Sequence, residues 1–260
     1  MNNVALAFLA HPDDAEFLCG GTLIRLIKEH GWSVHIATMT PGDCGSVEHP
    51  PADIARIRRS EGEDAAHLIG AAFHCVEERD LRIVFSEVSL ERAVNLLTAV
   101  RPRLVITHSP DDYHLDHEMT SEIVRAATFA APIPNFLYGR WRDPPLEHIP
   151  HLFYCDPVEG KDVFGNPIPA GFHIDITPQI ELKTRALACH ASQRDWLLKH
   201  HAVDDYLSSM RDWAAQQGKR AGAQFAEGFR QHLGHSYPQN NLLVELLGKP
   251  AKGGQNSLPL

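Results

Sequence analysis

Short apolar runs alternate with amphipathic segments along the first half of the chain. Apolar runs bounded by turn residues are typical of buried strands, and apolar residues spaced by three and four are typical of helices. The pattern predicts strands at residues 4–10, 32–40, 73–77 and 104–107, and helices at 22–30, 53–70, 87–100 and 116–130. Because strands and helices alternate, we expect an α/β fold with a mostly parallel sheet and helices on both faces.

The second half of the chain has a less regular pattern. Proline and aromatic residues concentrate at 132–150, which predicts an irregular excursion. The remaining predictions are strands at 152–155, 172–176 and 224–229, a helix at 178–190, one or two helices within 195–217, and a flexible connection at 218–222. We expect one domain over residues 1–248 and a flexible C-terminal tail over 249–260.

Composition excludes several classes of protein. Hydrophobic residues at 43% and charged residues at 22% are ordinary globular values. A net charge of −9 argues against nucleic acid or an anionic membrane surface as a partner. No signal peptide is evident, because polar residues from His11 onward interrupt the first apolar run. Five scattered cysteines fit free thiols in a reducing compartment, so we expect a cytoplasmic protein.

Two polar turns carry the candidate chemistry. His11, Asp13 and Asp14 follow the first predicted strand, and the segment from His114 to His117 follows the fourth. Each turn also precedes a predicted helix. In α/β sheets, ligands bind outside the carboxyl ends of the strands, so the two turns should meet at one edge of the sheet.

The residues of the two turns suit metal-assisted hydrolysis of an amide or ester. His11, Asp14 and His117 would supply three ligands and leave one position open, as catalytic zinc requires, although two histidines and a carboxylate also suit Fe2+. Asp13 would act as general base, and a protonated His114, held by Asp116, would stabilise an oxyanion.

Other polar residues of these turns have structural interpretations. An aspartate at either turn could cap the following helix. We expect His108 to end its strand, and Asp111 and Asp112 to form the turn, because Pro-Asp-Asp is typical turn chemistry. The loops around the predicted site, at 41–51 and 109–114, are polar, so little apolar surface is expected for a substrate.

Two motifs resemble those of the LmbE-like, or PIG-L, family of N-acetylglucosaminyl deacetylases. They are residues 10–16, followed by Gly20-Gly21-Thr22, and residues 114–117. Weaker similarity continues through 58–61, through Lys183 and 190–193, and through 226–229. The resemblance implies a Rossmann-like fold, a zinc held by His11, Asp14 and His117, Asp13 as base and His114 at the oxyanion. It also implies a homo-oligomer, with a hexamer among the candidates.

The resemblance further implies substrate-binding residues. Arg58 would grip a substrate hydroxyl or acidic group, and Glu227 and His190 would line the site; each has a structural alternative. Several relatives carry a tyrosine where this chain has Phe225, which lacks a hydroxyl. We expect a replacement from His235, with Tyr237 and His232 as further candidates, in this chain or in a neighbouring subunit.

The leading interpretation is a zinc-dependent deacetylase acting on the 2-acetamido group of a small N-acetylglucosamine-containing molecule. The alternatives are an amidase of the same mechanism acting on a thiol conjugate or natural product, and a metal-bound carbohydrate-binding protein without turnover. A dinucleotide-binding oxidoreductase is disfavoured, because no G-x-G-x-x-G follows the first strand.

Overall fold

One seven-stranded sheet forms the centre of the molecule. The computed structural model describes residues 3–140, 142–193 and 206–248. Its strands lie in the order β3-β2-β1-β4-β5-β7-β6. Strands β1 to β5 run parallel to one another, and β7 runs antiparallel to both β5 and β6. The strands are β1 (Val4–Leu9), β2 (Ser33–Thr38), β3 (Ala72–Cys75), β4 (Leu104–Thr107), β5 (His151–Cys155), β6 (Phe172–Asp175) and β7 (Ala226–Gln231).

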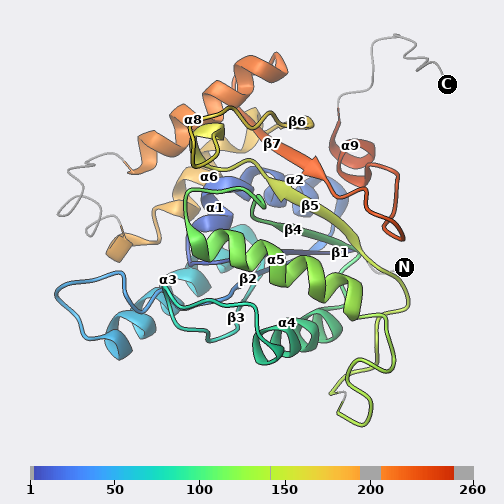
Figure 1. Cartoon of the computed structure of the whole chain (residues 1–260). Helices are drawn as coiled ribbons and strands as arrows, with labels where there is room; N and C mark the ends of the chain where they lie inside the picture. Colours follow the sequence, from blue (N-terminus) through green and yellow to red (C-terminus); the bar gives the residue numbers. More distant parts are fainter. Residues whose placement is uncertain (1–2, 141, 194–205, 249–260) are drawn as a thin grey trace.

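Helices cover both faces of this sheet (Figure 1). Two of them, α4 (Glu87–Val100) and α5 (Leu115–Ala130), pack together on one face. The opposite face carries α2 (Gly20–His30), α3 (Pro51–Ile69), α6 (Ile180–Leu187), α8 (Tyr206–Ala221) and α9 (Leu242–Leu247). The short helix α1 (Asp14–Leu18) connects β1 to α2.

The alternation of side chains along β1 explains why two helical layers form. Ala5, Ala7 and Leu9 point into one apolar cluster, and Leu6, Phe8 and Ala10 point into the other. All six are fully buried. A strand buried on both faces needs apolar residues at every position, which is the pattern that the sequence shows from residue 4 to residue 10.

The strand order places a crevice beside β1. The chain adds β2 and β3 on one side of β1 and then crosses to β4 on the other side, so the order reverses between β1 and β4. Ligands of open α/β sheets bind at such a switch point, at the carboxyl ends of the strands. The two polar turns predicted to carry the chemistry follow β1 and β4.

The fold class is confirmed, and one local prediction is wrong. Residues 218–222 do not form a flexible connection, because α8 continues to Ala221 and Gly218 is buried within it. The predicted tail at 249–260 lies outside the described residues. Within the described part of the chain, no helix has the length and apolar character needed to cross a membrane.

Candidate functional site

The turn after β1 has an unusual backbone. Asp13 has φ of 105° and ψ of −28°, in the left-handed region, and lies at the N-cap of α1. Aspartate adopts this region more readily than most residues, but it still costs about 1–3 kcal/mol. The turn places Asp13 and Asp14 on the wall of one cavity with His11.

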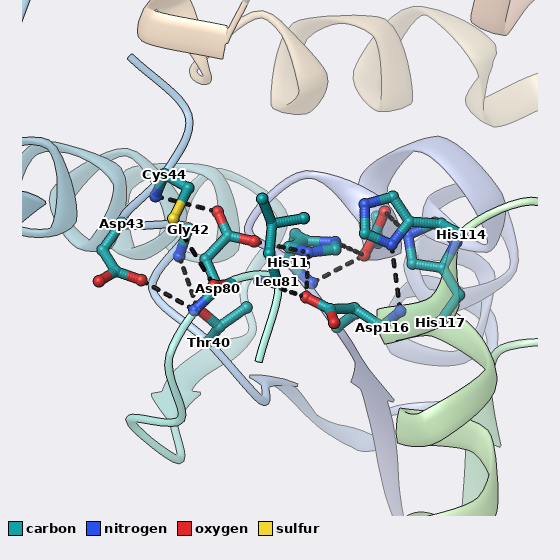
Figure 2. A network of polar contacts seen from close by, with 12 residues as sticks. His11, Thr40, Gly42, Asp43, Cys44, Asp80, Leu81, His114, Asp116 and His117 are labelled. Atoms are coloured by element: carbon teal, nitrogen blue, oxygen red, sulfur yellow. Dashed lines mark hydrogen bonds and ion pairs between the residues drawn. The ribbon is translucent and has the colours of Figure 1, made fainter. Parts of the chain in front are cut away.

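Three candidate metal ligands come together at this point. One donor atom each of His11, Asp14 and His117 lies within 4.8 Å of the others. His11 Nδ1 is 3.3 Å from Asp14 Oδ2, and His117 Nε2 is 3.6 Å from Asp14 Oδ1. Figure 2 shows His11, from the turn after β1, and His117, from α5, near one another. The donor set is two imidazoles and a carboxylate, which is typical of catalytic zinc.

Further carboxylates orient the two imidazoles. His117 Nδ1 is 3.0 Å from Asp112 Oδ1, and His11 Nε2 is 3.3 Å from Asp80 Oδ1. Such partners fix the tautomer and orientation of a metal-binding histidine. Neither carboxylate was predicted here: Asp112 was expected to form the turn, and Asp80 had no predicted role. Their position just after β4 and after β3, at the same sheet edge, was the available signal.

The crowded charges shift the pKa values of these groups. Burial alone would lower the pKa of His11, but the neighbouring aspartates raise it well above its usual value. Burial alone would raise the pKa of Asp14, but the imidazoles of His117 and His108 lower it well below its usual value. The centre therefore holds more buried acceptors than donors, which favours a cation there.

Asp13 is held by two groups outside its own turn. Tyr206, on α8, donates a hydrogen bond of 2.6 Å to Asp13 Oδ2. Arg58 Nη2 lies 3.7 Å from Asp13 Oδ1. Burial raises the pKa of Asp13, and the positive charge of Arg58 opposes that change. Tyr206 was also missed, because nothing in the sequence connects this helix to a turn almost two hundred residues earlier.

The guanidinium of Arg58 is largely occupied by the protein. It is buried and donates to the carbonyl oxygens of Pro12 at 2.9 Å and Gly42 at 3.4 Å. A Cβ at Gly42 would clash with it, so this glycine makes room for the guanidinium. Arg58 still lines the cavity, so its predicted contact with a substrate stays a prediction.

The expected pairing of His114 with Asp116 is different in the structure. His114 caps α5, and its Nδ1 accepts the backbone N–H of Asp116 at 3.1 Å. The Asp116 carboxylate instead accepts the N–H of Leu81 at 2.7 Å and lies 3.5 Å from His11 Nε2. Burial, together with the nearby imidazoles, lowers the pKa of His114. Because Nδ1 accepts a hydrogen bond, Nε2 is the ring nitrogen of His114 that could donate to a substrate, and the predicted protonation of His114 stays a prediction.

Two predicted substrate-binding residues lie elsewhere. The buried Glu227 carboxylate accepts from the N–H groups of Gly21 and Thr22, both at 2.8 Å, and from Lys183 Nζ at 2.5 Å. His235 lies in an exposed turn after β7, beyond the amino ends of the parallel strands. Neither Glu227 nor His235 lines the cavity of this chain, and their contacts with a substrate stay predictions.

The other candidates for the missing hydroxyl are also occupied. Tyr237 bonds to Thr128 Oγ1 at 3.0 Å and donates to the Arg125 carbonyl at 2.9 Å. His232 bonds to the Tyr154 hydroxyl at 2.9 Å. Tyr113, Tyr206 and Ser209 line the cavity and carry hydroxyls, and that of Tyr206 donates to Asp13.

The cavity at the site has a volume of about 380 Å3, within the range of small-molecule sites. A larger hollow of about 560 Å3 lies near the start of β5 and holds none of the predicted site residues. The described residues that line the smaller cavity are His11, Asp13, Asp14, Phe17, Leu18, Cys44, Gly45, Arg58, Asp80, Leu81, Tyr113, His114, His117, Val158, Gln193, Tyr206 and Ser209.

Comparison with known proteins finds relatives over most of the chain. Residues 6–128 match the family model described as PIG-L, GlcNAc-PI de-N-acetylase. A 4-oxalmesaconate hydratase of Pseudomonas putida is 25% identical over 197 residues, covering 73% of this chain and 73% of the relative. A second relative, from a Mycobacterium species, is a 1D-myo-inositol 2-acetamido-2-deoxy-alpha-D-glucopyranoside deacetylase. It is 24% identical over 237 residues, covering 71% of this chain and 72% of the relative.

A solved structure supports the fold. The N,N'-diacetylchitobiose deacetylase of Pyrococcus horikoshii superposes with a TM-score of 0.76 at 24% identity, covering 88% of this chain and 84% of that one. At this identity the likeness shows the architecture alone. The matched family segment, 6–128, includes both polar turns.

Proposed function

Residues 6–128 match the PIG-L family model, and from this match we propose that the protein is a metal-dependent deacetylase of small N-acetylated amino sugars. The mycobacterial and Pyrococcus relatives are both named as deacetylases of such compounds. The observation that carries the proposal is a buried carboxylate, Asp13, beside a three-donor set to which it does not contribute. A site that only binds has no need of that extra carboxylate.

The residues present fit a divalent metal ion. His11, Asp14 and His117 would hold it, with Asp80 and Asp112 fixing the imidazoles. Zinc suits this donor set best, and Fe2+ is the alternative. When bound, such an ion lowers the pKa of a water to about 7 and polarises an acyl carbonyl.

Asp13 would then move the proton. Its carboxylate would accept a proton from the attacking water and pass it to the leaving amine. Tyr206 lies at Oδ2 and Arg58 at Oδ1, and these two contacts would restrict the orientation of the carboxylate. Because burial raises the pKa of Asp13, the group is a better proton acceptor than an exposed aspartate.

His114 would stabilise the oxyanion as a neutral donor. Its Nδ1 is used by the Asp116 N–H, so the ring proton resides on Nε2. A neutral N–H donor needs no second carboxylate to hold a positive charge. Asp116 would instead orient His11 and the backbone at Leu81.

The cellular setting is also proposed. All five cysteines are unpaired, which fits a reducing compartment such as the cytoplasm. A homo-oligomer stays a prediction.

A hydratase is the second candidate, because a relative of similar identity carries that name. Adding water to a double bond also uses an activated water and a base. The purified protein should be assayed for acetate release from N-acetylglucosamine glycosides, before and after chelation and zinc restoration. A parallel assay follows hydration of an unsaturated dicarboxylic acid.

Chelator-sensitive acetate release that zinc restores would support the deacetylase. Hydration without acetate release would replace it with the second candidate. The Asp13→Asn variant should keep its zinc and lose acetate release; if it keeps both, Asp13 is not the base.

A further inference from the structure

Two apolar side chains stand at the mouth of the catalytic cavity. Leu81 and Tyr113 both line it, and each is 64% exposed. We call this pair the apolar rim. The composition of the surrounding loops had predicted little apolar surface for a substrate.

Single exposed apolar residues are ordinary on protein surfaces, so exposure alone assigns nothing. What distinguishes the apolar rim is that catalytic residues hold it in place. The N–H of Leu81 donates to the Asp116 carboxylate at 2.7 Å, and Figure 2 shows Leu81 in the network of His11, Asp80 and Asp116. Leu81 also has φ of 60°, a conformation that bulky residues rarely adopt.

Tyr113 is fixed by the histidines. Its ring meets the His114 ring edge to face, with centroids 5.8 Å apart, and the His117 ring at 5.5 Å. A large ring thereby lies next to a candidate metal ligand, His117, on the wall of the cavity. Aromatic rings contribute much contact area and have few rotatable bonds.

The depth of the cavity decides which part of a substrate meets the apolar rim. The reacting amide must lie at the buried donors, since His117 and Asp13 are less than one tenth exposed. The exposed apolar rim therefore contacts a part of the substrate further from the amide. In an amino-sugar glycoside, that part is the group attached to the sugar.

We propose that Leu81 and Tyr113 are specificity-determining residues, and that the substrate is an N-acetylated amino sugar carrying an apolar or aromatic aglycone. This inference rests on the proposed function. Burial of the aglycone removes apolar surface from water, which supplies the preference. Because this contact is made equally before and during the reaction, it should lower KM and leave kcat nearly unchanged.

The test compares the phenyl and methyl β-glycosides of N-acetylglucosamine. Zinc-loaded Asp13→Asn protein is titrated with each glycoside by calorimetry, and the wild-type enzyme is assayed on both. We expect Kd and KM to be about tenfold lower for the phenyl glycoside. Equal values for the two glycosides would overturn the proposal.

The variants identify the residues responsible. Leu81→Asn keeps a similar size and suits a positive φ, and Tyr113→Ser removes the ring; both should abolish most of the phenyl preference. Tyr113→Phe should retain it. Leu233→Asn is the matched control, because Leu233 is 57% exposed and does not line the cavity. If Leu233→Asn reduces the preference as much, the assignment is wrong.

The remaining outcomes separate the two proposals. If Leu81→Asn changes the sedimentation mass and weakens both glycosides equally, the apolar rim is a contact between copies and the specificity proposal fails. If the wild type releases no acetate but the binding preference and its loss in Leu81→Asn hold, the deacetylase fails and the apolar rim stands. If the wild type releases acetate but shows no preference for the phenyl glycoside, the deacetylase stands and the specificity proposal fails.

Discussion

Two buried acidic clusters lie near the starts of α2 and α1, and they differ in how their charges are satisfied. In the first, Glu227 accepts three hydrogen bonds, from Lys183 and from two backbone N–H groups. In the second, His11 faces Asp14, Asp80 and Asp116 at once, each at 3.3–3.5 Å. An imidazole has two ring nitrogens, so it cannot satisfy three carboxylates.

The difference separates a structural site from a chemical one. A fully satisfied buried ion pair fixes its elements and leaves no atom for a ligand. The second cluster has surplus acceptors, and the backbone of Asp13 beside it is in the left-handed region. Both features raise the free energy of the folded state unless a cation binds. The segment around Glu227 and the turn from His11 to Asp14 both resemble motifs of one family. Only His11 and its neighbouring aspartates line the cavity.

The sharpest test of this contrast is Asp13→Asn. The change removes the proposed proton acceptor and retains the shape, so kcat should fall about 10²–10⁴-fold. Asparagine tolerates a positive φ, and one negative charge leaves a crowded centre, so the melting temperature should stay the same or rise. Steady-state kinetics, metal analysis and thermal unfolding check this. A fall in stability comparable to that of a core mutation would break the contrast.

Lys183→Met should give the opposite result. It leaves the buried Glu227 charge with backbone partners only, so the free energy of unfolding should fall by about 3–5 kcal/mol. Zinc content and kcat of the folded protein should not change. Denaturant unfolding measures the loss, with the exposed Lys219→Met as a control expected within about 0.5 kcal/mol of wild type. A large loss of kcat would show that the two clusters are not separate.

Asp111 and Asp112 are adjacent aspartates, of which only Asp112 contacts a candidate metal ligand, so they offer a matched pair of variants. Asp112 is buried and bonds to His117 Nδ1 at 3.0 Å, whereas Asp111 is exposed. Asp112→Asn should weaken zinc binding about 10–100-fold, and Asp111→Asn should leave it unchanged. Competition with a coloured chelator measures both affinities. Equal affinities for the two variants would remove Asp112 from the site.

Tyr206→Phe should have the smallest effect. Loss of one hydrogen bond to the Asp13 carboxylate should lower kcat roughly tenfold, with KM and zinc content unchanged. A positioning role predicts this split, whereas a role in binding predicts a change in KM. Phe17→Leu, which removes the ring stacked on Tyr206 at 5.8 Å and keeps the hydroxyl, serves as the control for packing.

The sequence predicted those parts of the site that follow directly from strand ends. His11, Asp13 and Asp14 come after β1, and His114 and His117 come after β4, so strand polarity alone brings them together. The parallel sheet was predictable for the same reason, since its strands alternate with helices.

The parts that were missed depend on long-range packing. Tyr206 reaches Asp13 from a helix that packs on α6 and β7, a placement that no local pattern encodes. Glu227 was a candidate because 226–229 resembles a family motif, and a resemblance does not give the direction of β7. In the structure that strand is antiparallel, and its buried glutamate meets the start of α2. Asp80 lies in a loop with no helix start behind it.

The contact between Glu227 and the start of α2 joins positions 205 and 206 residues apart in the chain. During synthesis, the first α/β units emerge from the ribosome well before the strand that caps α2. Contacts of such long range slow folding, because a large loop must close before they form. A chain terminated before Glu227 would therefore carry the ligand motifs at 11–14 and 114–117 but lack this contact at the start of α2.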